Sequence, residues 1–263
     1  MDLGLKGKTA LVFGGSKGLG RGTAEALAAE GVSLALMARE PTSLDETVRA
    51  IAGRHGVDVY GVSADLADTA ATLAAVDEAE RVLGGRIDIL LNNTGGPPPS
   101  PVVGIDPALW RPHFEAMVLS VFGITDRILP GMRARGWGRV LTVAGTVVQE
   151  PNPALAMSNI LRSALVGWSK TLAGEVARDG VTVNLLLPGQ IATDRTLFLD
   201  RKAAERQGTT PDAVKAAKAA GIPVGRYGSP EEFGAVAAFL ASEQAAYITG
   251  SMIRVDGGVV RSV

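Results

Sequence analysis

TALVFGGSKGLGRGTAEALAAE, residues 9–30, joins a short apolar run to a glycine-rich turn and then to an alanine-rich stretch. This order predicts a strand over Thr9–Phe13 and a helix over Gly18–Glu30. Glycines let backbone N–H groups approach a pyrophosphate, and the start of a helix adds unpaired donors and partial positive charge. An ordinary glycine-rich turn is the alternative, but the flanking strand and helix favour a phosphate-binding turn. The residues expected to form it are Gly14, Ser16, Lys17, Gly18, Leu19 and Gly20.

Apolar runs alternate with helical stretches along the rest of the chain. The runs are apolar throughout, a pattern typical of parallel strands covered by helices on both faces. The sequence therefore predicts an α/β fold, a single Rossmann-type doubly wound parallel sheet with helices on both faces, forming one domain over residues 1–263. Further strands are expected over Ser33–Ala38, Val57–Val62, Ile87–Leu91, Arg139–Val143, Val181–Leu187 and Met252–Val255. Further helices are expected over Ser43–Arg54, Ala70–Leu83, Pro107–Arg135, Asn159–Arg178 and Glu231–Ser242.

Two segments stand outside this alternation. GGPPPSP, residues 95–101, predicts a stiff loop just past the C-terminal end of a strand, where such sheets place ligands. Residues 194–224 form a long irregular region, polar and charged at its start and helical later, which is a candidate lid over a substrate.

The composition limits the class of protein. A hydrophobic content of 46% supports a substantial core, and a net charge of −1 argues against nucleic-acid or membrane-surface partners. The chain has no cysteine, which excludes disulfides, cysteine metal sites and thiolate nucleophiles. Without a recognisable signal peptide or membrane-spanning run, the expected location is the cytoplasm.

Several motifs occur in an order that resembles the short-chain dehydrogenase/reductase family. The turn has the spacing Gly-xxx-Gly-x-Gly, and Asn92–Gly95, Pro188-Gly189 and Val255–Gly258 resemble the family's NNAG, PG and VDGG motifs. Phe13 departs from the family's usual threonine. The NNTGGPPP loop and the SNILR segment look like a divergent group similar to β-ketoacyl carrier-protein reductases. The resemblance covers essentially the whole chain and implies a nicotinamide cofactor, a small-molecule carbonyl substrate and a homotetramer.

The end of the second predicted strand indicates which cofactor is used. NAD sites usually place an acid there for the ribose hydroxyls, but this strand ends Met37-Ala38-Arg39. The guanidinium of Arg39 and the ammonium of Lys17 can both bind a 2′-phosphate, which predicts NADP(H). Glu40 is a weak argument against that choice. The resemblance further implies cofactor contacts from Asp65, Leu66, Asn92, Gly95, Arg162, Pro188, Gly189, Ile191 and Thr193.

The family's proton-donating residues are replaced in this sequence. The family pattern is Tyr-xxx-Lys on a helix with a serine thirteen residues before the tyrosine, and those positions hold Ser158, Arg162 and Gly145. Met117 stands where the family has an asparagine. A serine hydroxyl is a far weaker acid than a phenol, and an arginine keeps its charge but does not give up a proton. Ser158 and Arg162 are therefore the candidate catalytic residues, because an i, i+4 spacing places them on one helix face.

Three functions fit these observations. The first is an NADPH-dependent reductase of a ketone, aldehyde or 3-oxoacyl group with a non-standard proton path. In this reading Arg162 stabilises an oxyanion or binds a substrate carboxylate, and Ser158 holds a water molecule. The second is a catalytically inactive NADP(H)-binding sensor. The third is a non-redox enzyme that reuses the pocket.

Overall fold

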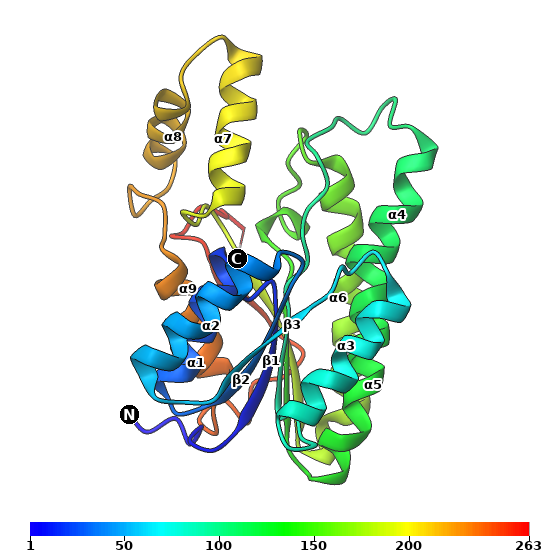
Figure 1. Cartoon of the computed structure of the whole chain (residues 1–263). Helices are drawn as coiled ribbons and strands as arrows, with labels where there is room; N and C mark the ends of the chain where they lie inside the picture. Colours follow the sequence, from blue (N-terminus) through cyan, green and yellow to red (C-terminus); the bar gives the residue numbers. More distant parts are fainter. Residues whose placement is uncertain (263) are drawn as a thin grey trace.

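Seven parallel strands form one sheet in the computed structural model, which describes residues 1–262 (Figure 1). The strand order is β3-β2-β1-β4-β5-β6-β7, so the direction of winding reverses between β1 and β4. This arrangement confirms the predicted doubly wound α/β fold. The strands are β1 (Thr9–Phe13), β2 (Ser33–Ala38), β3 (Val59–Ser63), β4 (Ile89–Asn92), β5 (Gly138–Val143), β6 (Val181–Pro188) and β7 (Met252–Val255).

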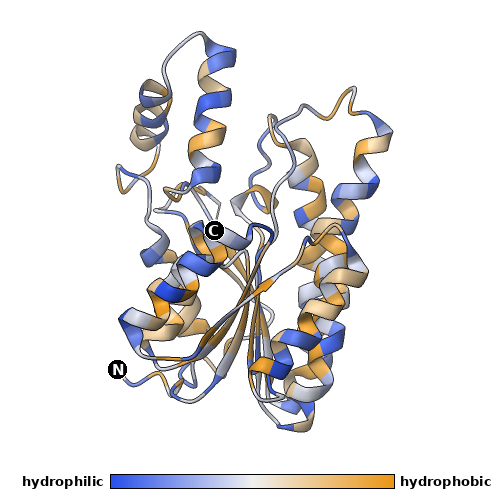
Figure 2. Ribbon diagram, viewed as in Figure 1, coloured by the Kyte–Doolittle hydropathy of each residue, from blue (hydrophilic) through white to orange (hydrophobic). Residues whose placement is uncertain are grey.

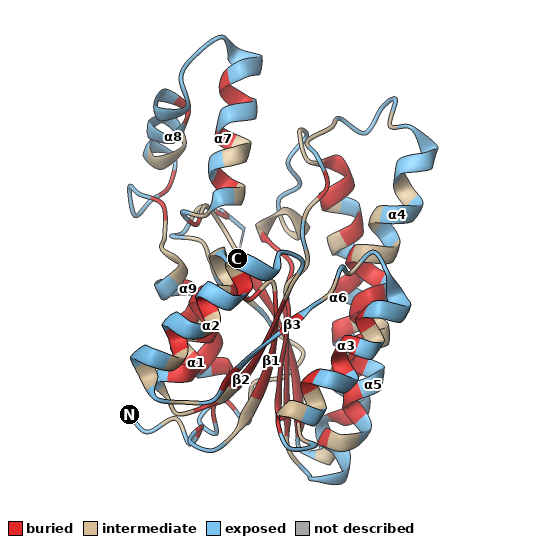
Figure 3. Cartoon of the chain, viewed as in Figure 1, coloured by how far each residue is buried: buried red, intermediate tan, exposed pale blue. Residues whose placement is uncertain are grey.

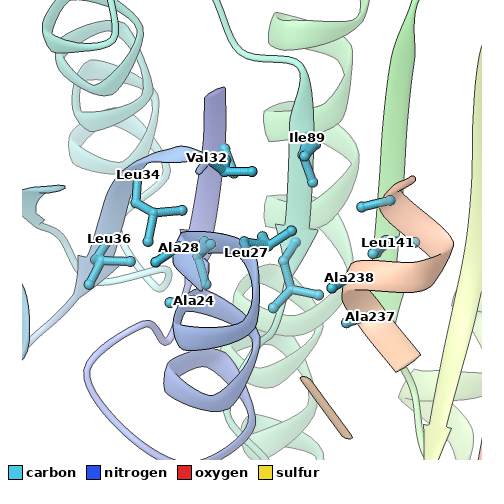
Figure 4. Packing of buried hydrophobic residues seen from close by; sticks show 14 of the residues in the cluster. Ala24, Leu27, Ala28, Val32, Leu34, Leu36, Ile89, Leu141, Ala237 and Ala238 are labelled. Atoms are coloured by element: carbon cyan, nitrogen blue, oxygen red, sulfur yellow. The ribbon is translucent and has the colours of Figure 1, made fainter. Parts of the chain in front are cut away.

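Helices cover both faces of the sheet (Figure 1). On one side α1, α2 and α9 pack against side chains such as Val12 and Leu36, and Figure 4 shows Leu27 and Ala238 in this layer. On the other side α3, α5 and α6 pack against the alternate side chains, including Leu11 and Phe13. The helices are α1 (Gly18–Ala29), α2 (Pro41–His55), α3 (Thr69–Val82), α4 (Trp110–Phe114), α5 (Ser120–Ala134), α6 (Ala156–Val176), α7 (Asp194–Gln207), α8 (Pro211–Ala220) and α9 (Pro230–Ala241).

The two edge strands depart from the uniformly apolar pattern. Three of the five residues of β3 and all four residues of β7 are partly or fully exposed. The strands between them are buried along nearly their whole length (Figure 3). An edge strand has a neighbour on one side only, and the flanking helices cover it incompletely. Orange, apolar ribbon accordingly concentrates in the central strands and on the helix faces turned toward them (Figure 2).

The helical region predicted over Pro107–Arg135 is not one continuous helix. It consists of a 3₁₀ turn, α4, a π-helical segment over Glu115–Leu119 and α5. The hydroxyl of Ser120 donates to the carbonyl of Ala116 at 2.8 Å, while the Ser120 amide bonds to the carbonyl of Glu115. The side chain thus occupies the acceptor that its own amide would use in a regular α-helix, which explains the wider turn.

Residues 194–224 are helical from their first residue, which corrects the expectation of an irregular start. α7 and α8 form a helical hairpin that projects beyond the C-terminal ends of the strands (Figure 1). Thr193 and Thr210 cap the two helices, each accepting a hydrogen bond from an amide three residues later. The polar composition that made the segment look irregular reflects exposure on most sides and a small shared core of Ala203, Ala204 and Val214.

Candidate functional site

A cavity of about 520 Å³ opens at the C-terminal ends of β1, β2, β3 and β4, next to the point where the winding reverses. Ligands of doubly wound sheets bind at this position. Among the residues predicted to bind a cofactor, those that line the cavity are Gly14, Ser16, Lys17, Arg39, Asp65, Leu66 and Gly95.

The phosphate-binding turn is tightly built. Gly14 and Gly18 have φ values of +63° and +52°, which favour glycine. A Cβ on Gly14 would lie 2.6 Å from Nδ2 of Asn93, and one on Gly20 would lie 2.2 Å from the carbonyl oxygen of Gly14. Helix α1 begins after Lys17 with no side chain capping its first amides. The uncapped amides can donate hydrogen bonds to a diphosphate, and the glycines have no side chain to keep it away.

The two predicted phosphate-binding cations are both part of the cavity wall. Lys17 and Arg39 both line it, and the Arg39 side chain is 77% exposed, with Nη1 4.0 Å from Oδ2 of Asp65. Its guanidinium is therefore free to bind another anion. Glu40 also lines the cavity, but its carboxylate accepts a hydrogen bond from the amide of Thr42 and caps α2. That local role explains an acid at this position in a site that also suits a phosphate.

Asn92 does not lie where the motif placed it. Its side chain is 1% exposed and donates to the hydroxyls of Thr125 and Thr142, at 3.2 and 3.3 Å. The neighbouring Asn93 lines the cavity instead and donates to the carbonyl of Phe13. Side chains alternate between the faces of a strand, so adjacent residues at its end serve different purposes.

Eight other predicted contact residues do not line the cavity, and Gly18 and Arg162 are two of them. Leu19 packs against the core, and Gly20 lies against Gly14. Of the remaining four, Pro188 ends β6 and the other three follow it. Thr193 lies 3.3 Å from where a Cβ on Gly18 would be, so this segment adjoins the phosphate-binding turn. The four are Pro188, Gly189, Ile191 and Thr193.

Ser158 and Arg162 lie on one face of α6, as their spacing predicted. Nε of Arg162 donates to Oγ of Ser158 at 3.3 Å, and Nη1 donates to the carbonyl of Val143 at 2.7 Å. The aliphatic part of the Arg162 side chain passes Gly145. A Cβ on Gly145 would lie 4.0 Å from Cδ of Arg162. Gly145 has a φ of +126°, so it holds a backbone conformation that a serine side chain would strain.

Burial, together with the smaller effect of the nearby charge of Arg195, lowers the pKa of Arg162 to about 10. This pKa is lower than the ordinary pKa of an arginine side chain, yet the guanidinium stays charged at neutral pH. Arg162 is thus a fixed cation rather than a proton donor there. Met117 lines the cavity from the π-helical segment.

Arg195 belongs to the site, although sequence reasoning did not single it out. Its Nη2 donates to the carbonyl of Pro97 at 2.6 Å, which joins the start of α7 to the 95–101 loop. Burial lowers its pKa. The signal in the sequence was a cation two residues after Thr193, at the start of the candidate lid.

None of the three tyrosines replaces the missing phenol. Tyr227 donates to the buried carboxylate of Asp200, which also pairs with Lys218 at 2.6 Å. Burial and the Asp200 charge raise the pKa of Tyr227, which makes it a poorer acid. Tyr60 and Tyr247 are exposed on the surface.

Two other features are absent from residues 1–262. No group of three or more His, Asp or Glu side chains in that range could hold a metal ion. In the same range, no helix combines the length and apolar character needed to cross a membrane.

Comparisons with known proteins agree with this geometry. A family model described as Enoyl-(Acyl carrier protein) reductase matches residues 14–260. The 3-oxoacyl-(acyl-carrier-protein) reductase FabG of Escherichia coli is 34% identical over 257 residues, which cover 98% of this chain and 99% of that protein.

Two solved structures are also similar. L-sorbose reductase from Gluconobacter frateurii, complexed with NADPH and L-sorbose, has a TM-score of 0.94 and 33% identity, with 100% of both chains covered. YwfH, an NADPH-dependent reductase involved in bacilysin biosynthesis, has a TM-score of 0.92 and 30% identity, with 97% of this chain and 99% of that chain covered.

Proposed function

The chain belongs to the short-chain dehydrogenase/reductase family, and on that premise we propose that it is an NADPH-dependent reductase of a small-molecule carbonyl compound. The observation that carries the proposal is the cavity at the switch point, which combines open backbone amides with Lys17 and Arg39. The similar proteins include reductases that were solved with, or named for, NADPH.

The residues of the cavity fit NADP(H). In the proposed arrangement the amides at the start of α1 bind the diphosphate, Lys17 and Arg39 bind the 2′-phosphate, and Asp65 and Leu66 contact the adenine. When bound, the cofactor supplies a hydride for the carbonyl carbon. The helical hairpin at 194–224 is proposed as the lid over the substrate, and Arg195 already connects it to the 95–101 loop.

The carbonyl oxygen gains negative charge during reduction and needs a stabilising group and a proton. In the proposal the fixed charge of Arg162 stabilises the oxyanion. The hydroxyl of Ser158, 3.3 Å from Nε of Arg162, orients a water molecule that delivers the proton. A water molecule is required because neither Ser158 nor Arg162 is acidic enough at neutral pH.

Consumption of NADPH at 340 nm by the purified protein tests this function. The panel contains ketones, aldehydes, keto acids and β-ketoacyl thioesters, and turnover of at least one class is expected. Binding of NADPH, seen as enhanced fluorescence, with no reduction of any compound would contradict the proposal and favour a sensor. Product formation without a change in NADPH would favour a non-redox enzyme.

Replacing Arg39 with alanine tests the choice of cofactor. A charge-assisted hydrogen bond to the 2′-phosphate would be lost, so the Kd of NADPH is expected to rise about tenfold, while that of NADH changes less than about twofold. Fluorescence titration measures both constants. Arg49→Ala is the matched control, since Arg49 is exposed on α2 and does not line the cavity. An equal change for both cofactors would contradict a role in phosphate recognition.

We also propose that the protein forms a homotetramer, as the family resemblance implies. Leu119 and Ile160, at the π-helical segment and on α6, are 45% and 47% exposed and provide apolar surface for association. Sedimentation velocity is expected to give the mass of four chains, and a monomer would contradict this part.

A further inference from the structure

Two arginines reach the same loop from different elements. Arg162 on α6 donates from Nη2 to the carbonyl of Gly95 at 3.3 Å, and Arg195 on α7 donates from Nη2 to the carbonyl of Pro97 at 2.6 Å. Gly96 lies between the two acceptors, and a Cβ there would be 3.0 Å from Nη2 of Arg195. The two guanidinium groups therefore converge on a three-residue stretch next to Ser158.

Neither guanidinium has a carboxylate partner within ion-pair distance among residues 1–262. The other largely buried cations differ in this respect, because Arg139 lies 3.8 Å from Glu243 and Lys218 lies 2.6 Å from Asp200. Arg162 instead has the like charge of Arg195 nearby, and the charge of Arg195 adds to burial in lowering the pKa of Arg162. Two desolvated positive charges without a counterion are unfavourable, and an anion between them would offset that cost.

Donors remain available for such an anion. Within the described chain, Arg195 uses only Nη2 in a hydrogen bond, which leaves Nε and Nη1 without an acceptor. The planar fork of a guanidinium matches the two oxygens of a carboxylate. Arg162 lies beside Ser158, so an acid group held here would place an adjacent carbonyl next to the proposed proton path.

We propose that Arg195, beside the oxyanion-stabilising charge of Arg162, binds the carboxylate of the substrate, so that the enzyme reduces keto acids in preference to neutral ketones. This inference rests on the proposed function, because it assigns the substrate class of that site. The cofactor's diphosphate is the other anion that could reach Arg195, since Thr193 adjoins Gly18. The experiment therefore measures cofactor and substrate separately.

The test compares benzoylformate with its methyl ester, which differ in the charge of one group, as substrates for the NADPH-loaded enzyme. The wild type is expected to have the higher kcat/KM for the acid. Arg195→Gln is expected to lower kcat/KM for the acid roughly 10- to 100-fold, the effect of losing a charge-assisted hydrogen-bonded pair. The value for the ester and the Kd of NADPH are expected to change less than about twofold.

Arg201→Gln is the matched control, because Arg201 is exposed on the same helix and the substitution removes the same charge. It is expected to behave as wild type. Acid and ester activities that fall together in Arg195→Gln, or a Kd of NADPH that rises by the same factor, would overturn the proposal. Those results would mean that Arg195 holds the loop or binds the cofactor.

A binding measurement separates this inference from the proposed function. Phenylacetate and phenylacetamide are titrated calorimetrically into protein saturated with NADP⁺. Binding of the acid that is lost in Arg195→Gln and kept in Arg201→Gln would support the carboxylate site, even if the enzyme reduced neither benzoylformate compound. Equal binding of acid and amide, or no binding that depends on Arg195, would overturn it.

Discussion

Arg162→Ala is expected to lower kcat for carbonyl reduction roughly 10²- to 10³-fold, the usual cost of removing one group that stabilises an oxyanion. Arg162 is the one fixed positive charge in contact with Ser158 within the described chain, and it is held by the carbonyls of Val143 and Gly95. Its charge is independent of pH up to about pH 9, because its pKa is about 10. No loss of activity below that pH is therefore expected from this residue.

Steady-state rates at saturating NADPH measure the effect, and fluorescence titration establishes that the variant still binds the cofactor. Arg162→Lys keeps a charge and is expected to recover part of the lost rate. Ser158→Ala is expected to cost less, about tenfold, because a water molecule remains able to approach. Wild-type rates in Arg162→Ala would show that another group stabilises the developing charge, and the proposed proton path would be wrong.

Gly234→Ala is expected to destabilise the fold by about 3 kcal/mol, at the upper end of what overpacking usually costs. Helices α1 and α9 cross at Gly22 and Gly234, both of which are buried. A Cβ on Gly234 would lie 2.2 Å from the carbonyl oxygen of Gly22. The obstructing atom is backbone, so a rotamer change cannot relieve the clash and the helices must separate.

Thermal unfolding monitored by circular dichroism measures this prediction, and a decrease in Tm of roughly 6–12 °C is expected for a chain of this size. NADPH binding is expected to weaken as well, since α1 carries the phosphate-binding turn at its start. Gly53→Ala is the control, because Gly53 is exposed in α2 with no atom within 4 Å of its Cβ position. That variant is expected to gain about 0.5–1 kcal/mol. An unchanged Tm for Gly234→Ala would mean that the helix crossing adapts easily.

The sequence by itself determined the sheet, its parallel strands and the phosphate-binding turn. These features depend on local patterns, since apolar runs, glycine spacing and helix starts act over a few residues. The i, i+4 spacing of Ser158 and Arg162 is likewise local, and their contact was predicted correctly. Exposure of β3 and β7 was missed, because the position of a strand at an edge depends on the order of all seven strands.

Only the tertiary structure decided which side chains meet at the site. Asn92 turns toward Thr125 and Thr142, and Arg195 reaches Pro97 from a residue 98 positions away in the sequence. The pKa of Arg162 depends on burial and on that same arginine. Contacts of this kind arise when distant segments are brought together by the packed sheet and helices, and electrostatic free energies depend on the resulting distances and solvent exclusion. No spacing within the chain encodes them.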